Sequence, residues 1–367
     1  MPAITPSARV RPSPFYDATV AEGVTSFTSY NNMLMPTGYG DPDAEYWRLI
    51  DGVSQWDVSV ERQVEMIGPD AGRLAQMLCA RDLSKCKVGQ GKYVPLCNHW
   101  GVLINDPILL KLSDDRYWLS IADSNIWFWA RSIAAERGLD VIVREPDVSP
   151  LAVQGPMAEN TMASLLGDWV RDLKYFWFRE TVLDGIPLAV ARSGWSKQGG
   201  FELYLMDGTK GTQLWNLVKE AGKPWDIGPG NPNQSERVES GLLSYGSDTD
   251  DRTTPFEVGL GNYVDLDIDD DVVGIKALRE IVSRGHQRHQ LGVIFDDDAA
   301  AVAHPTWLPL SVNGQEMGHL TISVQSPRLE KTIGLALLST ECRPGDRIEV
   351  RKGTNVAHGT LTTLPFI

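Results

Sequence analysis

Cysteine is scarce in this chain of 367 residues, which has four, none of them in a Cys-x-x-Cys pair. The sequence therefore predicts neither a disulfide framework nor a zinc site, and we expect no metal. No run of apolar residues approaches the ~20 that a membrane-spanning helix needs. The opening segment also lacks the apolar centre of a signal peptide, so we expect a cytoplasmic protein that has no membrane partner.

Positively charged residues are also few. The chain has 34 lysines and arginines but 48 aspartates and glutamates, which gives a net charge of −14. A chain this acidic repels phosphate backbones at long range, so we expect no nucleic-acid partner. The GxxxxGK[ST] loop, the GxGxxG turn and the HExxH helix are missing, which argues against phosphoryl transfer, Rossmann-type dinucleotide binding and zincin chemistry. His286 and His289 have no third ligand nearby, which favours a surface pair over a metal site.

Tryptophan, in contrast, is abundant. The chain has 12 tryptophans against 10 tyrosines and 9 phenylalanines, although tryptophan is normally the rarest of the three. Most of these large aromatic side chains are expected in hydrophobic cores. The excess nevertheless raises the question whether some of these tryptophans bind a ligand.

The chain's patterns divide it into two regions. Up to about residue 280, helical and strand spacings alternate without the regular βα repeat of a Rossmann sheet, with a helix predicted over 41–58 and a buried strand over 151–156. Beyond that point short strands follow one another, and Asn313-Gly314 predicts a tight hairpin turn. We therefore expect two interleaved α+β domains in residues 1–280 and an all-β domain in residues 281–367.

Five separated segments carry motifs that occur together, in this order, in one protein family. The segments are Val102–Asp106, Ala152–Pro156, Arg192–Glu202, Arg237–Glu257 and Ser326–Ala336. Together they resemble the glycine cleavage T-protein (aminomethyltransferase) superfamily of tetrahydrofolate-dependent enzymes. This resemblance implies an α+β fold, a three-domain cloverleaf with a C-terminal β barrel and a central folate-binding hole.

One segment narrows the resemblance within the superfamily. Ser193-Gly194-Trp195-Ser196 is followed by Lys-Gln-Gly, where the T-protein has an acidic Gly-Glu-Asp. In this the chain is similar to the members that demethylate dimethylsulfoniopropionate, moving a methyl group to N5 of tetrahydrofolate and giving methylmercaptopropionate and 5-methyltetrahydrofolate. The implied partners are a small sulfonium substrate and folate, with a homo-oligomer possible. An aminomethyltransferase, a demethylase of glycine betaine or dimethylglycine, and a non-catalytic folate-binding protein stay open as alternatives.

The resemblance also assigns residues to the methyl donor. A sulfonium is already a good leaving group, so positioning is the main task, and aromatic faces attract its positive charge. The implied sulfonium pocket consists of Trp169, Trp195 and Tyr204, with Tyr204 also contributing a hydroxyl to catalysis. Arg11 is the candidate for the substrate's carboxylate. Ordinary core packing is the alternative for either tryptophan.

A second set of residues is assigned to tetrahydrofolate. Glu202 is expected to accept hydrogen bonds from the pterin, and Asp106 to act in catalysis beside N5. Tyr93, Phe176 and Ser120 are expected to flank or hydrogen-bond the pterin, and Arg237 to attract the glutamate tail. Asp106 has an alternative role as a turn-capping residue before Pro107, and Arg237 as the partner of Glu236 or Glu239 in a structural ion pair.

Overall fold

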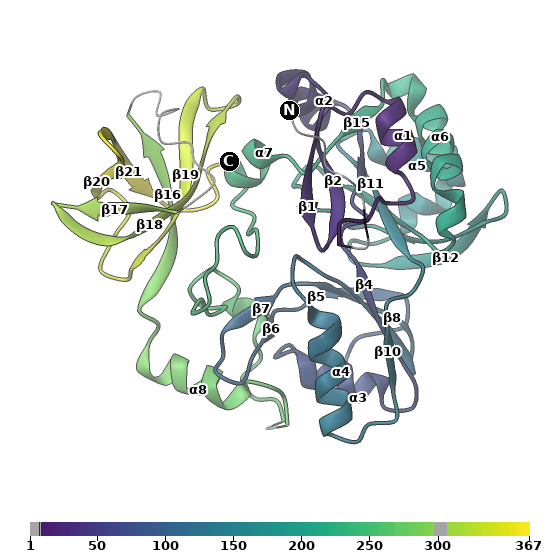
Figure 1. Cartoon of the computed structure of the whole chain (residues 1–367), viewed down its shortest axis with the longest axis horizontal. Coiled ribbons are helices and arrows are strands. Elements are labelled where there is room, and N and C mark those ends of the chain that lie inside the picture. Colours follow the sequence, from purple (N-terminus) through teal and green to yellow (C-terminus); the bar gives the residue numbers. More distant parts are fainter. Residues whose placement is uncertain (1–6, 8, 270, 297–306) are drawn as a thin grey trace. The chain divides into compact units, whose positions relative to one another are not determined.

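The computed structural model describes residues 7, 9–269, 271–296 and 307–367. The chain divides into two compact units. The first comprises Met1–Gln76, Leu83–Val94 and Pro107–Asn233, and the second Met77–Asp82, Pro95–Asp106 and Gln234–Ile367. Figure 1 labels their helices and strands.

Two sheets form the centre of the first unit. The five-stranded sheet has the order β10 (Ile142–Arg144), β4 (Gln63–Ile67), β9 (Arg116–Ser120), β8 (Ile108–Ser113) and β5 (Gln90–Tyr93), with every pair antiparallel. The six-stranded sheet has the order β12 (Phe178–Leu183), β13 (Ile186–Ala191), β14 (Gly200–Leu205), β11 (Ser149–Gln154), β3 (Ser54–Asp57) and β15 (Gly228–Gly230). All six residues of β11 are buried, which confirms the buried strand predicted there.

Helices and a hairpin complete the first unit. The hairpin pairs β1 (Ser26–Tyr30) with β2 (Met33–Gly38). The helices are α1 (Tyr16–Ala21), α2 (Pro42–Asp51), α3 (Ala71–Leu78, whose last residues belong to the second unit), α4 (Ile126–Glu136), α5 (Ala158–Leu166) and α6 (Gly211–Gly222). Short 3₁₀ helices cover Asp168–Asp172 (η1), Gly208–Lys210 (η2) and Lys223–Trp225 (η3). The helices α5 and α6 pack their apolar faces on the six-stranded sheet through residues such as Met162, Leu214 and Trp215.

The helix predicted over 41–58 is shorter than expected. It begins with Asp41, whose side chain accepts a hydrogen bond from the backbone of Ala44, and with Pro42 in its first turn. It ends at Asp51, and Ser54–Asp57 forms strand β3. The helix stops because Gly52 adopts a backbone conformation outside the helical region.

The second unit contains the barrel. β16 (Arg288–Phe295), β19 (Lys331–Ser339), β18 (Gln315–Ser326), β17 (Leu308–Val312), β20 (Arg347–Lys352) and β21 (Asn355–Thr362) close in that order. Val293, Leu310 and Val350 are among the fully buried residues of its core. β16 and β21 close the barrel, with Gly292 opposite Thr362. The predicted Asn313-Gly314 turn is confirmed, because both residues have positive φ and join β17 to β18.

The remaining elements of the second unit are short. They are the two-stranded sheet β6 (Leu96–Cys97) and β7 (Leu103–Asn105), the helices α7 (Gln234–Glu239) and α8 (Ile275–Arg284), and the 3₁₀ helix η4 (Gly261–Tyr263). Of the pair His286 and His289, His289 lies in strand β16, and His286 follows the end of helix α8. No helix in the described ranges is both long enough and apolar enough to cross a membrane.

Candidate active site

A buried carboxylate organises one part of the first unit. Glu202 and Tyr204 lie two residues apart on β14 and therefore on the same face. Glu202 is 4% exposed, and its Oε2 accepts hydrogen bonds from the Ser193 hydroxyl at 2.5 Å and from the Tyr204 hydroxyl at 3.2 Å. Burial raises the pKa of Glu202, while the hydrogen bonds from Ser193 and Tyr204 oppose that shift.

The five-stranded sheet contributes to the same network. Ser120 lies beside Tyr204, accepts a hydrogen bond from Gln63 Nε2 at 2.9 Å and donates one to Glu61 at 3.3 Å. Burial, followed by the negative charges of Glu202 and Glu61, raises the pKa of Tyr204. The structure thus brings together three residues that the sequence assigned separately, Ser120, Glu202 and Tyr204. We call Glu61, Gln63, Ser120, Ser193, Glu202 and Tyr204 the Glu202 cluster.

The side chain of Gln154 holds the loop between β13 and β14 in place by hydrogen bonds, and Trp195 lies in this loop. Its Nε2 donates to the carbonyl of Ser193 at 3.2 Å, and its Oε1 accepts from the Ser196 hydroxyl at 2.8 Å. A Cβ added to Gly194 or Gly200 would overlap the Gln154 side chain, and both glycines have positive φ. The two sequence motifs around Gln154 and Gly194 therefore form one structural unit.

Phe176 and Tyr93 lie on connected segments. Phe176 has a φ of 59°, a conformation that bulky side chains rarely adopt. Its carbonyl accepts a hydrogen bond from Gly91 of strand β5 at 2.6 Å, and its amide donates to the carbonyl of Arg192 at 2.9 Å. Tyr93 is the last residue of β5. Such a strained backbone, held from two sides, is typical of functional segments.

The two tryptophans assigned to the sulfonium have different surroundings. Trp169 lies on η1, packs against the core of the six-stranded sheet and has the Arg179 guanidinium 4.7 Å from its ring centroid. A cation thus already lies over Trp169, which favours the packing alternative for this residue. Trp195 is half-buried in the loop that Gln154 holds. Its position two residues after Ser193, a member of the Glu202 cluster, leaves it as the stronger candidate.

Arg11 is already ion-paired. Its guanidinium lies 2.8 Å from Glu145, a carboxylate that also pairs with Arg62. A substrate carboxylate that bound Arg11 would have to compete with Glu145. The geometry therefore gives Arg11 a structural partner that the sequence did not indicate.

In the second unit, Arg237 is completely buried. It pairs with Asp248 at 2.7 Å, where both side chains are 0% exposed, and it also donates to Gln234. Asp248 is a partner that the sequence analysis did not name. A guanidinium enclosed in this way offers no exposed charge for a glutamate tail, which favours the structural alternative.

Asp106 directly follows strand β7 and is half-buried. Strand β7 is held by a hydrogen bond from the amide of Leu103 to the carbonyl of Thr253 at 2.8 Å. The segment around Thr253 is fixed in turn by Arg288, which pairs with Asp250 at 2.8 Å and with Glu257 at 3.0 Å. Burial acts to raise the pKa of Asp250, but hydrogen bonds from Arg288 and Thr253 outweigh it and hold that pKa below its ordinary value.

The sequence did not single out several members of this site. Gln63 and Glu61 carry no recognisable motif, and Gln154, Ser193 and Ser196 lie within quoted motifs without an assigned role. One signal was present: along the segment that leads into β4, polar residues stand at every second position, and Gln63 and Glu65 are buried. Buried polar side chains on one face of a strand require partners, which marks such a strand as a candidate site.

The fold and this site define a mixed α+β protein with a C-terminal barrel, and comparison with known proteins identifies its family. The model of the GCVT N-terminal domain matches residues 15–268, and that of the glycine cleavage T-protein C-terminal barrel domain matches residues 288–367. The chain belongs to the glycine cleavage T-protein family. The predicted fold class is confirmed by the glycine cleavage system aminomethyltransferase T of Bartonella henselae, with a TM-score of 0.85 at 22% identity, covering 97% of this chain and 98% of that one.

Two curated relatives differ in how similar they are. The dimethylsulfoniopropionate demethylase DmdA of Ruegeria pomeroyi is 40% identical over 351 residues, which are 95% of each chain. An aminomethyltransferase of Bacillus mycoides is 28% identical over 366 residues, covering 96% of this chain and 97% of the relative. The demethylase is thus the more similar of the two at equal coverage.

Proposed function

We propose that this protein is a tetrahydrofolate-dependent demethylase that transfers a methyl group from dimethylsulfoniopropionate to N5 of tetrahydrofolate, giving methylmercaptopropionate and 5-methyltetrahydrofolate. The observation that carries the proposal is the 40% identity to the demethylase over 95% of each chain, against 28% to the Bacillus mycoides aminomethyltransferase. We further propose that the reaction needs no metal, because a sulfonium is already an activated leaving group. A cytoplasmic location and homo-oligomerisation belong to the same proposal.

The methyl donor is bound, in this proposal, by aromatic side chains near the Glu202 cluster. Trp195 is half-buried and offers a ring face to the sulfonium, and such a face contributes about 0.5 to 2 kcal/mol when desolvated. Tyr204 is fully buried, so its ring could face the sulfonium only if its neighbours moved. Trp169 could contribute only if Arg179 moved off its ring. Arg11 could bind the substrate carboxylate only in exchange for Glu145.

The residues of the Glu202 cluster suit a pterin. A carboxylate accepts two parallel hydrogen bonds from an amide and an amino group, and burial strengthens such bonds. Ser120 offers a further hydroxyl, and Phe176 and Tyr93 offer rings. Tetrahydrofolate, when bound, supplies the secondary amine that accepts the methyl group.

The overall transfer balances without an additional reactant. The S–CH₃ bond breaks and leaves its electron pair on sulfur, a C–N bond forms at the acceptor, and one proton is released. Tyr204, through its hydroxyl, orients Glu202 and the donor within the first unit. Two further roles are carried over from the family motifs alone. Asp106 is the proposed acceptor of the released proton, and Arg237 is proposed to bind the glutamate tail.

We also propose that the domain division lies near residue 280.

The test is a methyl-transfer assay with purified protein and tetrahydrofolate. Dimethylsulfoniopropionate, glycine betaine and dimethylglycine are offered separately, and 5-methyltetrahydrofolate is quantified by chromatography. We expect turnover with the sulfonium alone. Turnover with dimethylglycine or glycine betaine but not with the sulfonium would identify a methylamine demethylase, and folate binding without any turnover would leave a non-catalytic folate-binding protein. Formation of methylenetetrahydrofolate from an aminomethylated carrier protein would identify an aminomethyltransferase.

A further inference from the structure

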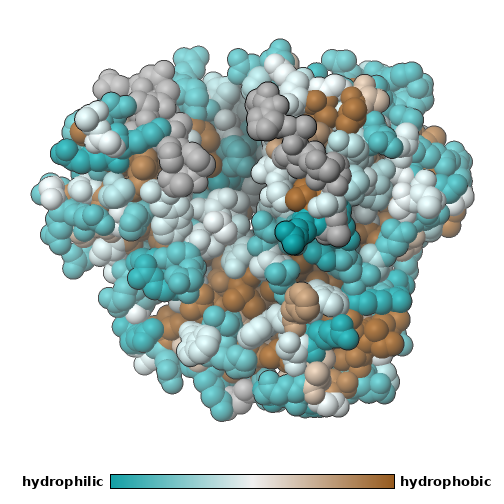
Figure 2. All heavy atoms as spheres, in the orientation of Figure 1, coloured by the Kyte–Doolittle hydropathy of each residue, from teal (hydrophilic) through white to brown (hydrophobic). Residues whose placement is uncertain are grey.

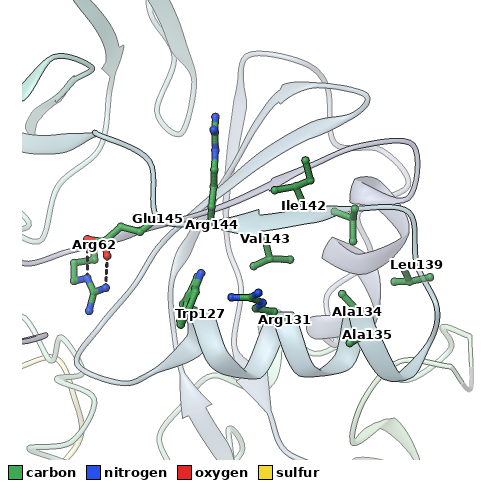
Figure 3. Close-up of a pocket in the computed structure, with 11 residues that line it drawn as sticks. Arg62, Trp127, Arg131, Ala134, Ala135, Leu139, Ile142, Val143, Arg144 and Glu145 are labelled. Carbon is green, nitrogen blue, oxygen red and sulfur yellow. Dashed lines mark hydrogen bonds and ion pairs between the residues drawn. The ribbon is translucent and has the colours of Figure 1, made fainter.

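A pocket lies outside the Glu202 cluster, between helix α4 and strand β10 of the first unit (Figure 3). Its volume is about 520 Å³, within the range of small-molecule sites. In the described part of the chain β10 pairs with β4 alone, so the strand has an open outer edge beside the pocket. Figure 2 shows apolar side chains at the surface around β10.

The pocket has an apolar end and a cationic end. At the apolar end, Ala135 and Leu139 line it together with Val143, whose side chain points from β10 towards α4 (Figure 3). At the other end are Trp127 and Arg131 of α4, with the Arg62–Glu145 ion pair beside them, whereas Arg144 points away on the opposite side of the strand (Figure 3). This separation of apolar and charged walls matches a ligand with an apolar body and one charged end.

Arg131 carries the charge that a ligand could use. Its guanidinium lies 5.3 Å from the Trp127 ring centroid, and no carboxylate pairs with it in the described residues. Glu145, the carboxylate that lines the pocket, is already paired with Arg62. The lining thus has an excess of positive charge in a chain whose net charge is −14. A guanidinium over an aromatic ring binds a planar carboxylate well.

We propose that this pocket binds a small amphipathic organic acid. The carboxylate lies against the Arg131 guanidinium, and the apolar body lies along Ala135, Leu139 and Val143. A smaller cavity of about 160 Å³ shares Arg62, Trp127 and Glu145 with the pocket and reaches Gln63 of the Glu202 cluster. None of the residues that line the larger pocket is itself proposed for the methyl donor or the pterin, although its Glu145 also pairs with Arg11.

The test uses the full chain and the fluorescent anion 8-anilinonaphthalene-1-sulfonate, an aromatic body with one charged group. Arg131→Glu and Ala135→Phe change the charged and the apolar end respectively. Their matched controls are Arg137→Glu and Ser132→Phe, which alter exposed residues of the same helical segment outside the pocket. We expect both pocket variants to weaken binding at least about tenfold and both controls to leave it unchanged, since an ionic or an apolar contact of that size is lost. Circular dichroism checks that all four variants fold.

Competition separates the possible sources of the anion. Octanoate should displace the probe from the wild type, and 5-formyltetrahydrofolate should not. Displacement by an acidic peptide but not by octanoate would overturn the proposal in favour of a protein partner. Displacement by the folate, or equal losses in pocket and control variants, would also overturn it. Because the readout is binding of the probe, absence of demethylase activity would leave this result unaffected.

Discussion

The contact between Gln154 and Gly194 provides the sharpest test of the site's construction. Replacement of Gly194 by Ala places a methyl group where the buried Gln154 amide lies. The side chain must then move and give up its hydrogen bonds to Ser193 and Ser196, which are 3.2 and 2.8 Å long. Each such bond is worth ~1 kcal/mol, and overpacking adds ~1 to 3 kcal/mol. The positive φ of Gly194 adds ~1 to 2 kcal/mol of backbone strain, so we expect Gly194→Ala to lower the free energy of unfolding by about 4 to 7 kcal/mol.

Gly199 is the matched control in the same loop. It also has a positive φ, 79°, but an added Cβ meets no atom within 4 Å. Gly199→Ala should therefore lower the free energy of unfolding by only ~1 to 2 kcal/mol, the cost of the left-handed backbone. Urea unfolding measures both variants. In the Gly194→Ala background, Gln154→Ala should be less harmful than in the wild type, because it makes room for the methyl group. Equal losses in the two glycine variants, with no coupling to Gln154, would refute the reasoning.

Four further predictions concern individual side chains. Glu202→Gln should weaken folate binding by about 1.5 to 3 kcal/mol, measured by calorimetry, and change the affinity for the methyl donor less, because it removes a charged acceptor; equal losses for both ligands would contradict the assignment. Trp195→Ala should raise KM for the sulfonium about 2- to 30-fold while Trp195→Phe largely restores it, and an unchanged KM would exclude Trp195 from the pocket. Arg237→Ala should lower the free energy of unfolding by about 3 to 5 kcal/mol because it leaves Asp248 buried without its cation; normal stability with loss of folate binding would instead support the ligand role. The pKa of Asp250 is depressed, so the stability that its ionised form contributes is present above the ordinary pKa of 3.8 and is lost as the pH falls below that value. The melting temperature of Asp250→Asn should therefore fall less than that of the wild type between pH 5 and about 3. Parallel curves for the two proteins would contradict this.

Much of the fold followed from the sequence because the motifs and the spacing of apolar residues agree. The buried strand at 151–156, the hairpin turn at Asn313-Gly314 and the change to an all-β barrel are all visible in the order of residue types. The overlong helix over 41–58 shows the limit of periodicity. Helical spacing continues across Gly52 in the sequence, whereas the backbone conformation of that glycine ends the helix.

The sequence predicted several residues of the candidate site, but it did not predict which residues contact one another. Ser120 and Glu202 come from distant segments on two different sheets, and only the packing of these sheets against each other brings them into one cluster of polar side chains. The sequence could not show that Arg237 pairs with Asp248, because its nearer glutamates are equally plausible partners by spacing. It also could not show that Arg179 lies over Trp169, since that contact depends on where strand β12 places the arginine.

The closure of the barrel has a consequence for engineering. Because β16 and β21 are neighbours, with Gly292 opposite Thr362, the first and the last barrel strand end close together in space. Closure leaves the barrel without a free strand edge, so added residues are tolerated in an exposed turn rather than along a strand. The turn at Asn313-Gly314 is such a place, because an added Cβ at Gly314 meets no neighbouring atom. A peptide or a small domain could therefore be inserted in the connection from β17 to β18 without changing any strand pairing.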